Sequence, residues 1–344
     1  MNTRAQIRRL PDGRRLHMHD GPIDLIVEAW GTPSEIHTAY RAAAARFVRV
    51  LDELCAELKF LRQPTTPDGP MPQGPIARRM VAAITPYAAS TFITPMAAVA
   101  GAVAEEILQT MTSAADLSRA YVNDGGDIAI HLAPGERFVV GMIEYPRPEA
   151  TALPPELTRC TLPNPPVFLC APRGSSSLST SNGTLRSEYE PQRNTLFGTT
   201  TIDFTHPVRG IATSGWRGRS FSLGIADAVT VLADTASKAD AAATIVANAV
   251  DLPGHPAIVR GPACELEPDT DLGNRMVTQS VGRLDLDEIH AALDAGAFVA
   301  EALREKKLIH AAALNLQGET RLIGTGNVIL SDGTSDHDRS LVHA

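Results

Sequence analysis

The sequence is short of cysteine, aromatic residues and positive charge, and each shortage excludes a class of protein. Cys55, Cys160, Cys170 and Cys264 show no CxxC spacing, so we expect buried apolar thiols rather than disulfides or a zinc site. Aromatic residues make up 5% of the chain, which argues against a surface that stacks nucleic-acid bases. Lys and Arg number 31 against 39 Asp and Glu, and this net charge of −8 argues against a nucleic-acid-binding protein.

Long hydrophobic runs are also missing. The most apolar stretch, residues 95–104, is followed by Glu105 and Glu106, whereas a membrane-spanning helix needs about 20 apolar residues. The basic N-terminus leads into no apolar segment of the kind that a secretory signal contains. We therefore expect a cytoplasmic protein without a membrane association, and we expect residues 95–104 to be a buried helix that other backbone approaches closely.

The apolar pattern predicts helices mixed with antiparallel strands. Thr32 and Glu35 form a capping-box pattern, and a stripe of apolar residues at spacings of three and four then predicts one long helix over residues 36–61. Further helices are expected at 76–84, 95–111 and 236–250 and after a second capping-box pattern formed by Asp285 and Glu288, and strands are expected within 14–30, 119–145, 199–234 and 308–325. Strict strand–helix alternation is absent, so we predict an α+β fold with antiparallel sheets.

Residues 146–198 differ from the rest of the chain. They are dense in proline and then polar and low in complexity, which predicts an exposed loop insertion. We therefore expect one domain over residues 1–344 with two halves, approximately 14–145 and 199–330, on either side of this insertion.

Asn123, Asp124, Gly125, Gly126 and Asp127 stand between two predicted strands. The glycines permit positive φ and the close approach of a ligand, with an amide and a carboxylate on either side. Asn, Asp and Gly are also the ordinary residues of turns, so a plain turn and a ligand loop both stay open.

A second candidate loop is rich in hydroxyl groups. Thr213, Ser214 and Gly215 follow a strand, and Gly218, Arg219 and Ser220 come soon after. Their backbone N–H groups could bind phosphate oxygens, with Arg217 or Arg219 as the counter-charge, although an ordinary loop is the alternative. The segment matches neither a P-loop nor a GxSxG nucleophile elbow.

Asp240 and Thr244 lie four residues apart in a predicted helix and so share one face. A carboxylate and a hydroxyl are ligands that Mg²⁺ accepts beside phosphate oxygens. The alternative is an Asp that interacts with the helix dipole and a Thr that bonds back along its helix.

Together these motifs carry a resemblance. TPMAAVAGAVAE, NDGGDIAI and TSGWRGRSFSLGIADAVTVLADTASKADAAATIVAN, in this order, resemble an uncharacterised prokaryotic family that looks like a distant branch of the FAD:protein FMN transferase (ApbE-like) superfamily. The resemblance covers residues 22–145 and 199–330. It implies a duplicated α/β fold with antiparallel sheets and a central groove that holds FAD or FMN, a small-molecule nucleotide.

The resemblance also implies roles for individual residues. The nucleotide would be bound by the buried helix, the glycine loop and the TSG loop, and the metal Mg²⁺ by the ADxxxT motif. The implied nucleotide-binding residues are Met96, Ala100, Gly101, Asn123, Gly125, Gly126, Asp127, Thr213, Ser214 and Gly215, and the implied metal ligands are Asp240 and Thr244.

One departure from the transferases bears on activity. They carry a histidine after the TSG loop, where this chain has Arg219 and Ser220. Transfer of FMN to a Thr or Ser of a flavoprotein target needs a base, and Asp127 or Asp227 could replace the histidine.

Three functions therefore stay open. The first is Mg²⁺-dependent FMN transfer or cleavage of the FAD pyrophosphate. The second is a flavin- or nucleotide-binding accessory protein without turnover. The third is a small-molecule hydrolase that uses Ser214 or Ser220 as its nucleophile. The catalytic candidates are Asp127, Arg219, Ser220 and Asp227, and the sequence predicts no oligomeric state.

Overall fold

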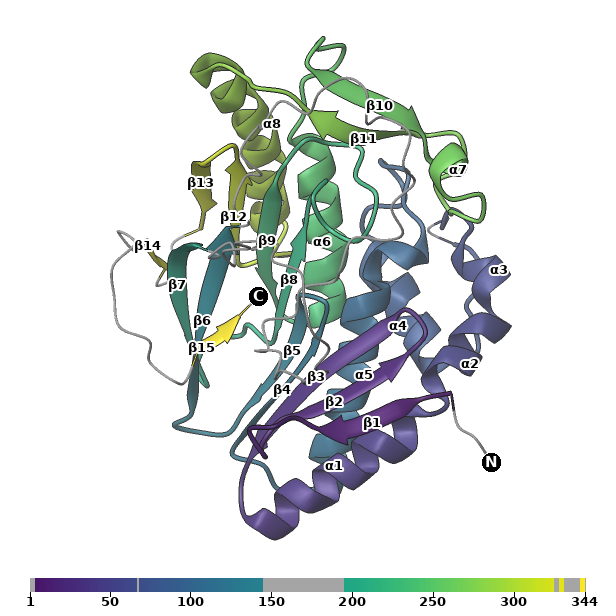
Figure 1. The fold of residues 1–344 in the computed structure, drawn as a ribbon, viewed down its shortest axis with the longest axis vertical. Coiled ribbons are helices and arrows are strands. Elements are labelled where there is room, and N and C mark those ends of the chain that lie inside the picture. Colours follow the sequence, from purple (N-terminus) through teal and green to yellow (C-terminus); the bar gives the residue numbers. More distant parts are fainter. Residues whose placement is uncertain (1–3, 67, 145–194, 325–327, 331–340, 344) are drawn as a thin grey trace, which may run out of the picture.

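The fold is built on one large antiparallel sheet (Figure 1), in a computed structural model that describes residues 4–66, 68–144, 195–324, 328–330 and 341–343. Nine strands follow the order β1-β2-β3-β4-β5-β8-β9-β12-β13, and every neighbouring pair is antiparallel. The strands are β1 (Gln6–Arg9), β2 (Leu16–Asp20), β3 (Ile23–Trp30), β4 (Arg119–Asp124), β5 (Asp127–Leu132), β8 (Gly210–Ser214), β9 (Ala228–Ala233), β12 (Ala311–Leu316) and β13 (Glu319–Ile323). The predicted α+β class with antiparallel sheets is confirmed.

The strand order repeats along the chain. β2 and β3 form a hairpin, helices follow, and β4 and β5 complete a first unit, while β8, β9, β12 and β13 repeat this arrangement around a second set of helices. Pairing of β5 with β8, through Ile128 with Ile211 and Ala129 with Gly210, joins the two units into one sheet. The ends of β4, β5 and β8 therefore meet where the two halves join.

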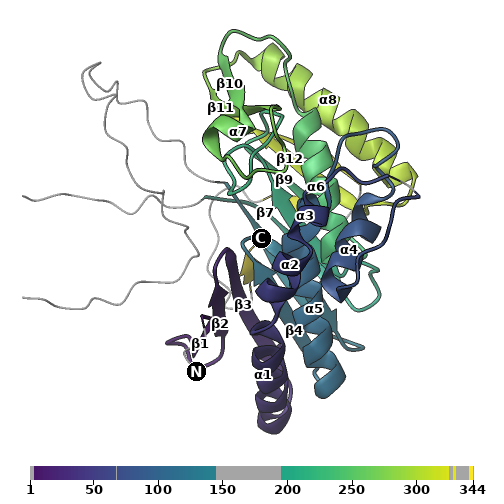
Figure 2. The ribbon, with the colours of Figure 1, turned by 90° about the vertical axis from the view of Figure 1, so that its right-hand side faces the viewer.

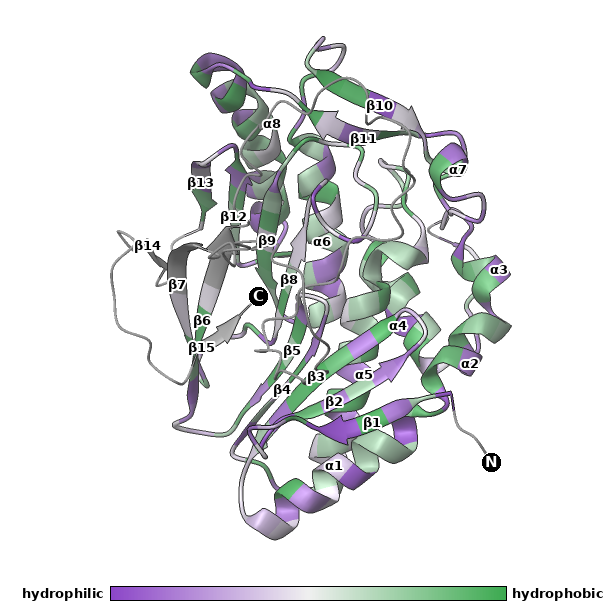
Figure 3. Cartoon of the chain, viewed as in Figure 1, coloured by the Kyte–Doolittle hydropathy of each residue, from purple (hydrophilic) through white to green (hydrophobic). Residues whose placement is uncertain are grey.

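The long helices cover one face of this sheet (Figure 2). The helices are α1 (Pro33–Phe47), α2 (Val50–Ala56), α3 (Leu58–Leu61), α4 (Pro75–Ile84), the 3₁₀ turn η1 (Pro95–Ala98), α5 (Val99–Ala114), α6 (Ala236–Ala249), α7 (Ala263–Leu266) and α8 (Leu286–Glu305). Phe47, Ile107, Val246 and Leu293 of this layer are buried in one core with sheet residues such as Leu25. Figure 3 shows mixed hydrophilic and hydrophobic residues along α1, as expected of a helix with one buried face.

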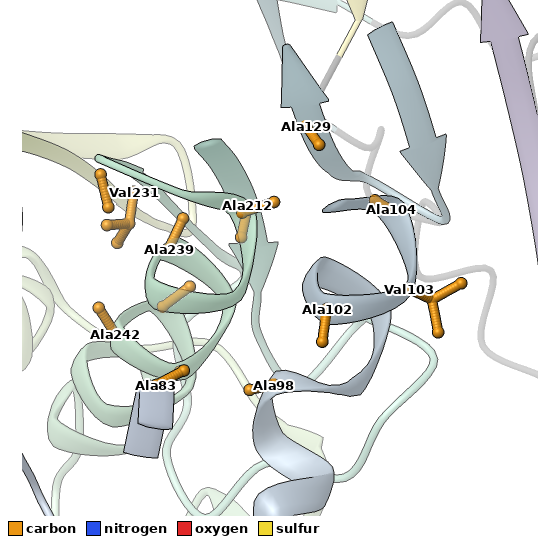
Figure 4. Close-up of a cluster of buried hydrophobic side chains, with 14 of the residues drawn as sticks. Ala83, Ala98, Ala102, Val103, Ala104, Ala129, Ala212, Val231, Ala239 and Ala242 are labelled. Atoms are coloured by element: carbon orange, nitrogen blue, oxygen red, sulfur yellow. The ribbon is translucent and has the colours of Figure 1, made fainter. Parts of the chain in front are cut away.

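Small residues bring α5 and α6 into close contact (Figure 4). Ala98 and Ala102 on one side and Ala239 and Ala242 on the other are fully buried. A Cβ atom added to Gly101 would lie 2.3 Å from the carbonyl oxygen of Ala236, a distance that no side chain tolerates. The predicted close approach of other backbone to residues 95–104 is confirmed at Gly101. Burial is confirmed for part of the segment, since Met96, Ala97, Val99 and Ala100 are half-buried, and the helix begins as the 3₁₀ turn η1.

A second sheet packs on the opposite face of the large sheet. It has the order β14 (Val328–Leu330), β7 (Thr195–Asp203), β6 (Arg137–Glu144) and β15 (Leu341–His343). Phe138, Val140 and Ile202 from this sheet are buried against Tyr121 and Ile130 of the large sheet. A separate hairpin of β10 (Ile258–Pro262) and β11 (Met276–Val281), which the sequence patterns did not predict, lies between α6 and α8 along the chain.

The single long helix predicted over residues 36–61 is wrong. The segment forms α1, α2 and α3, and the backbone tightens at Arg49, whose N–H donates to the carbonyl of Arg46 three residues earlier. The guanidinium of Arg46 donates to Glu106 on α5 and to Glu53 on α2. We attribute the break to these tertiary contacts, because the apolar stripe itself continues across it.

The cysteine prediction also needs a correction. Cys55 is exposed and Cys264 is half-buried, and both are free thiols. Cys160 and Cys170 lie outside the described residues, as does most of the predicted insertion at 146–198. None of the helices in the described ranges combines the length and hydrophobicity that a bilayer crossing requires.

Candidate functional site

Within the segment from Asn123 to Asp127, Gly125 and Gly126 form the two-residue turn between β4 and β5. Gly125 and Gly126 have φ angles of 67° and 118°, which glycine adopts readily and other residues rarely. The Asn123 Oδ1 atom accepts the N–H of Gly126 at 2.8 Å. Asp124 and Asp127 are directly paired across the turn, so their side chains lie on the same face of the sheet.

The TSG segment lies beside this turn. The N–H of Thr213 donates to Asp127 Oδ1 at 3.2 Å, and the hydroxyls of Thr213 and Thr230 are 2.9 Å apart. Gly215 has no room for a side chain, because an added Cβ would lie 2.6 Å from the carbonyl oxygen of Asp227. Two loops that are 86 residues apart in the sequence are thus connected through one carboxylate.

Asp240 connects α6 to the start of α5. Its Oδ2 atom accepts the N–H of Gly101 at 3.0 Å, in the first turn of α5, where backbone N–H groups have no partner within the helix. The N–H of Ala100 also bonds to Asp240, and Ala100 is half-buried, as is Met96 in η1. The structure therefore brings the buried helix, the glycine turn, the TSG segment and Asp240 together at the junction of the halves.

Three carboxyl groups at this junction have raised pKa values. Burial raises the pKa of Asp124 to about 7. Burial also raises the pKa of Asp127, and the charges of Asp240 and Asp124 raise it further. The pKa of Asp240 is raised by burial and by the charges of Asp124 and Glu105, although hydrogen bonds from Gly101 and Ala100 oppose the shift. We name Asp124, Asp127 and Asp240 the Asp cluster. Their raised pKa values mean that the cluster is stabilised when it binds either a proton or a cation.

Arg219 is a basic residue whose charge acts on this cluster. Its charge lowers the pKa of both Asp124 and Asp127, but burial outweighs the effect. The side chain is held against the glycine turn, since the Nη1 atom would lie 2.9 Å from a Cβ on Gly125, and Nη2 donates to the carbonyl of Pro22 at 2.8 Å. Arg219 is exposed and is therefore accessible to an anion outside the protein.

The donors present fit Mg²⁺ only if a ligand supplies further oxygens. Asp240 and Thr244 are both half-buried and lie one helical turn apart on α6. Among the described residues no group of three His, Cys, Asp or Glu is arranged to hold a metal ion by itself. Mg²⁺ commonly keeps few protein ligands and takes the rest from phosphate and water, so this donor set fits a metal bound with a phosphate ligand.

The other predicted catalytic residues differ in their surroundings. Asp227 accepts hydrogen bonds from the side chains of Trp216 and Arg217, at 3.1 and 2.5 Å, and from the N–H of Gln317 at 2.7 Å. These bonds give Asp227 a structural role in shaping the loop after β8. Ser220 is exposed and Ser214 half-buried, and neither bonds to a histidine or carboxylate in the described part of the chain.

No role was predicted from the sequence for Asp124, although it lies in the candidate turn, and neither Glu105 nor Pro22 was predicted at the junction. For Asp124 a signal existed, because a two-residue hairpin turn places the residues on either side of it opposite each other. Nothing in the sequence indicates that Glu105 reaches α6 or that Pro22 meets Arg219, since both contacts depend on how the halves pack.

Two cavities in the described residues lie away from the Asp cluster. One of about 20 Å³ lies between the two sheets, beside Thr230 and Ala312, and an open one of about 360 Å³ lies between α1 and α5, beside Ala42 and Gln109. The central groove at the junction therefore stays a prediction.

The fold and the site define a class of two-unit α+β proteins with carboxylates, glycine turns and helix N-termini at the junction of the units. A family model described as AbpE bacteria matches residues 7–162 and 176–322, and the chain belongs to this family. The gap in the match, residues 163–175, falls within the predicted insertion. A search of curated proteins found no match.

Proposed function

We propose that the chain binds the flavin dinucleotide FAD together with Mg²⁺ and acts on its diphosphate. The position of Asp240, beside Asp127 and bonded to the start of α5, carries this proposal. The motifs that resemble the FAD:protein FMN transferase superfamily support flavin as the ligand, and membership of the AbpE bacteria family is consistent with it.

Asp240 and Thr244 would hold Mg²⁺, which would neutralise charge that develops on phosphate oxygens. The backbone of Gly125, Gly126 and the TSG segment would bind the nucleotide, because glycines leave the chain open to close approach. Arg219 would contribute a guanidinium at the same turn.

Asp127 is the residue best placed to take a proton. In transfer, a hydroxyl oxygen of a flavoprotein target bonds to the FMN phosphorus, the bond to the AMP phosphate breaks, AMP leaves and the hydroxyl proton passes to a base. In pyrophosphate cleavage, water takes the place of the hydroxyl. A carboxyl group with a raised pKa is the better base near neutral pH, and this favours Asp127 over Asp227, whose oxygens already accept three hydrogen bonds.

A flavin-binding accessory protein without turnover is the second candidate. Arg219 and Ser220 stand where the transferases carry histidine, and within the described ranges no histidine bonds to Asp124, Asp127 or Asp240. The serine hydrolase has no comparable support, because Ser214 and Ser220 lack a base.

The experiment is to incubate the full chain with FAD, with and without Mg²⁺, and to measure retained flavin, released AMP and FMN. Asp240→Asn keeps an oxygen that can accept the N–H of Gly101 but removes the charge, so we expect Mg²⁺-dependent retention and turnover to fall at least tenfold. Asp234→Asn, which removes the same charge just before α6 where Asp234 pairs with Lys238, is the matched control and should behave as wild type.

The outcomes separate the candidates. Release of AMP supports action on the diphosphate, and flavin retained without AMP supports the accessory role. A wild-type protein that retains no flavin in either condition overturns the proposal.

A further inference from the structure

α5 and α6 cap each other where their N-termini meet. Asp240 on α6 accepts the N–H of Gly101 on α5 at 3.0 Å, and Glu105 on α5 accepts the N–H of Ser237 on α6 at 2.6 Å. Each helix thus supplies an acidic side chain to the free N–H groups of the other, where the helix dipole also favours a negative charge.

The contact leaves little freedom for the helices to shift. A Cβ on Gly101 would lie 2.3 Å from the Ala236 carbonyl oxygen and 2.7 Å from the Ser237 nitrogen. Ser237 and Asp240 are three residues apart, so they lie on the same side of α6. The bond from Glu105 therefore fixes the turn of α6 that carries Asp240.

Glu105 is itself held in place. Its other oxygen lies 3.6 Å from the Nε atom of Arg79 on α4, and its side chain is 17% exposed. This neighbour restricts the rotation of the carboxylate and leaves the Oε1 atom directed at α6.

We propose that Glu105 is a positioning residue, which sets the orientation of Asp240 at the site by accepting the N–H of Ser237. This role rests on the proposed function for its consequence in metal binding, but the orientation itself can be measured without a ligand. A purely electrostatic role is a distinct alternative, because the charge of Glu105 also acts on Asp240.

Two substitutions separate position from charge. Glu105→Gln keeps an oxygen that can accept the N–H of Ser237 and removes the charge, whereas Glu105→Ala removes both. Asp285→Ala is the matched control, because it removes the N-cap of α8, where Asp285 accepts the N–H of Glu288 at 2.9 Å. Loss of either cap should lower the melting temperature by a similar amount.

Two measurements follow on each full-length variant. The first is hydrogen exchange of the Gly101 amide, and the second is the Mg²⁺ concentration that gives half-maximal retention of FAD. We expect Glu105→Ala to raise both the exchange rate and the Mg²⁺ concentration about tenfold, the effect of losing one hydrogen bond to a charged group. Glu105→Gln should stay within about threefold of wild type, and Asp285→Ala should match wild type in both.

Each of these results decides whether Glu105 positions Asp240. If Glu105→Ala lowers only the melting temperature, as Asp285→Ala does, Glu105 is an ordinary cap and the inference is overturned. If Glu105→Gln is as defective as Glu105→Ala, charge rather than position is responsible, which also overturns it. If the wild type retains no FAD with Mg²⁺, the proposed function fails, while exchange at Gly101 still decides whether Glu105 positions Asp240.

Discussion

Helix α5 takes part in two groups of carboxylates, Glu106 with its partners and the Asp cluster, and the groups differ in what neutralises them. Glu106 accepts a hydrogen bond from Arg46 Nε at 2.6 Å and another from Arg79. Burial alone would raise the pKa of Glu106, but these two guanidinium groups outweigh it and hold the pKa below its ordinary value. In the Asp cluster burial prevails, and the pKa of Asp124 reaches about 7.

The two groups differ in the positive charge that faces them. The Glu106 group contains its own cations, on α1 and α4, and so joins helices. In the part of the chain that the structure describes, the Asp cluster faces the exposed Arg219 and keeps a deficit of positive charge that a bound cation would remove. The comparison therefore separates an internal ion pair from a candidate binding site.

The largest expected effect comes from breaking the first group. Arg46→Ala should lower the free energy of unfolding by about 3 kcal/mol, because it leaves Glu106 buried with only Arg79 of its two guanidinium partners. Denaturant unfolding measures this loss, and Arg41→Ala, on an exposed position of α1, should change stability by less than about 0.5 kcal/mol. A loss as small for Arg46→Ala would show that the two groups do not differ as described.

The pH dependence of the free energy of unfolding should distinguish the Asp cluster from Glu106. Since the pKa of Asp124 rises from its ordinary 3.8 to about 7 on folding, its contribution is complete below pH 4 and is lost as pH rises through 7. Without Mg²⁺, Asp124→Asn should therefore gain stability relative to wild type between pH 4 and pH 8, on the order of 4 kcal/mol. Glu106→Gln should show the opposite trend, with its deficit shrinking as pH falls. Parallel curves for Asp124→Asn and wild type would contradict the assignment.

A smaller effect tests the close contact between α5 and α6, beside Asp240 of the Asp cluster. Gly101→Ala should destabilise the protein by about 2 kcal/mol, because the new methyl group meets the backbone of Ala236. Alanine ordinarily stabilises a helix relative to glycine, so the sign itself is informative. Gly296→Ala in α8 meets only the side chains of Val250 and Leu314, which can move, and should cost less. If thermal unfolding shows the same loss of stability for Gly101→Ala and Gly296→Ala, the contact between Gly101 and the backbone of α6 is not rigid.

The starts of α1 and α8 could be predicted, because the signals for a helix N-terminus lie within a few neighbouring residues. The Thr32 hydroxyl accepts the N–H of Glu35 and the capping box of Asp285 and Glu288 is complete, as the sequence indicates. Thr32 and Glu35 do not complete theirs, since the Glu35 carboxylate accepts the N–H of Asp116 instead. We attribute the break between α1 and α2 to contacts of Arg46, one of which is with Glu106, a residue 60 positions away.

The candidate site also contains some features that the sequence predicts and others that depend on the packing of distant segments. The glycine turn follows from its residues, and Asp240 and Thr244 share a helix face by spacing alone. The contacts of Asp240 with Gly101 and of Asp127 with Thr213 join segments from different halves, so only the packing of the halves reveals them. Their roles in binding flavin and Mg²⁺ remain predictions.

The most direct test of the account is a crystal of the protein grown with FAD and Mn²⁺ in place of Mg²⁺, and examined by anomalous scattering. The account predicts a metal peak within coordination distance of the Asp240 carboxylate and the Thr244 hydroxyl, beside the glycine turn. Flavin and metal bound elsewhere, or no bound metal at all, would contradict it.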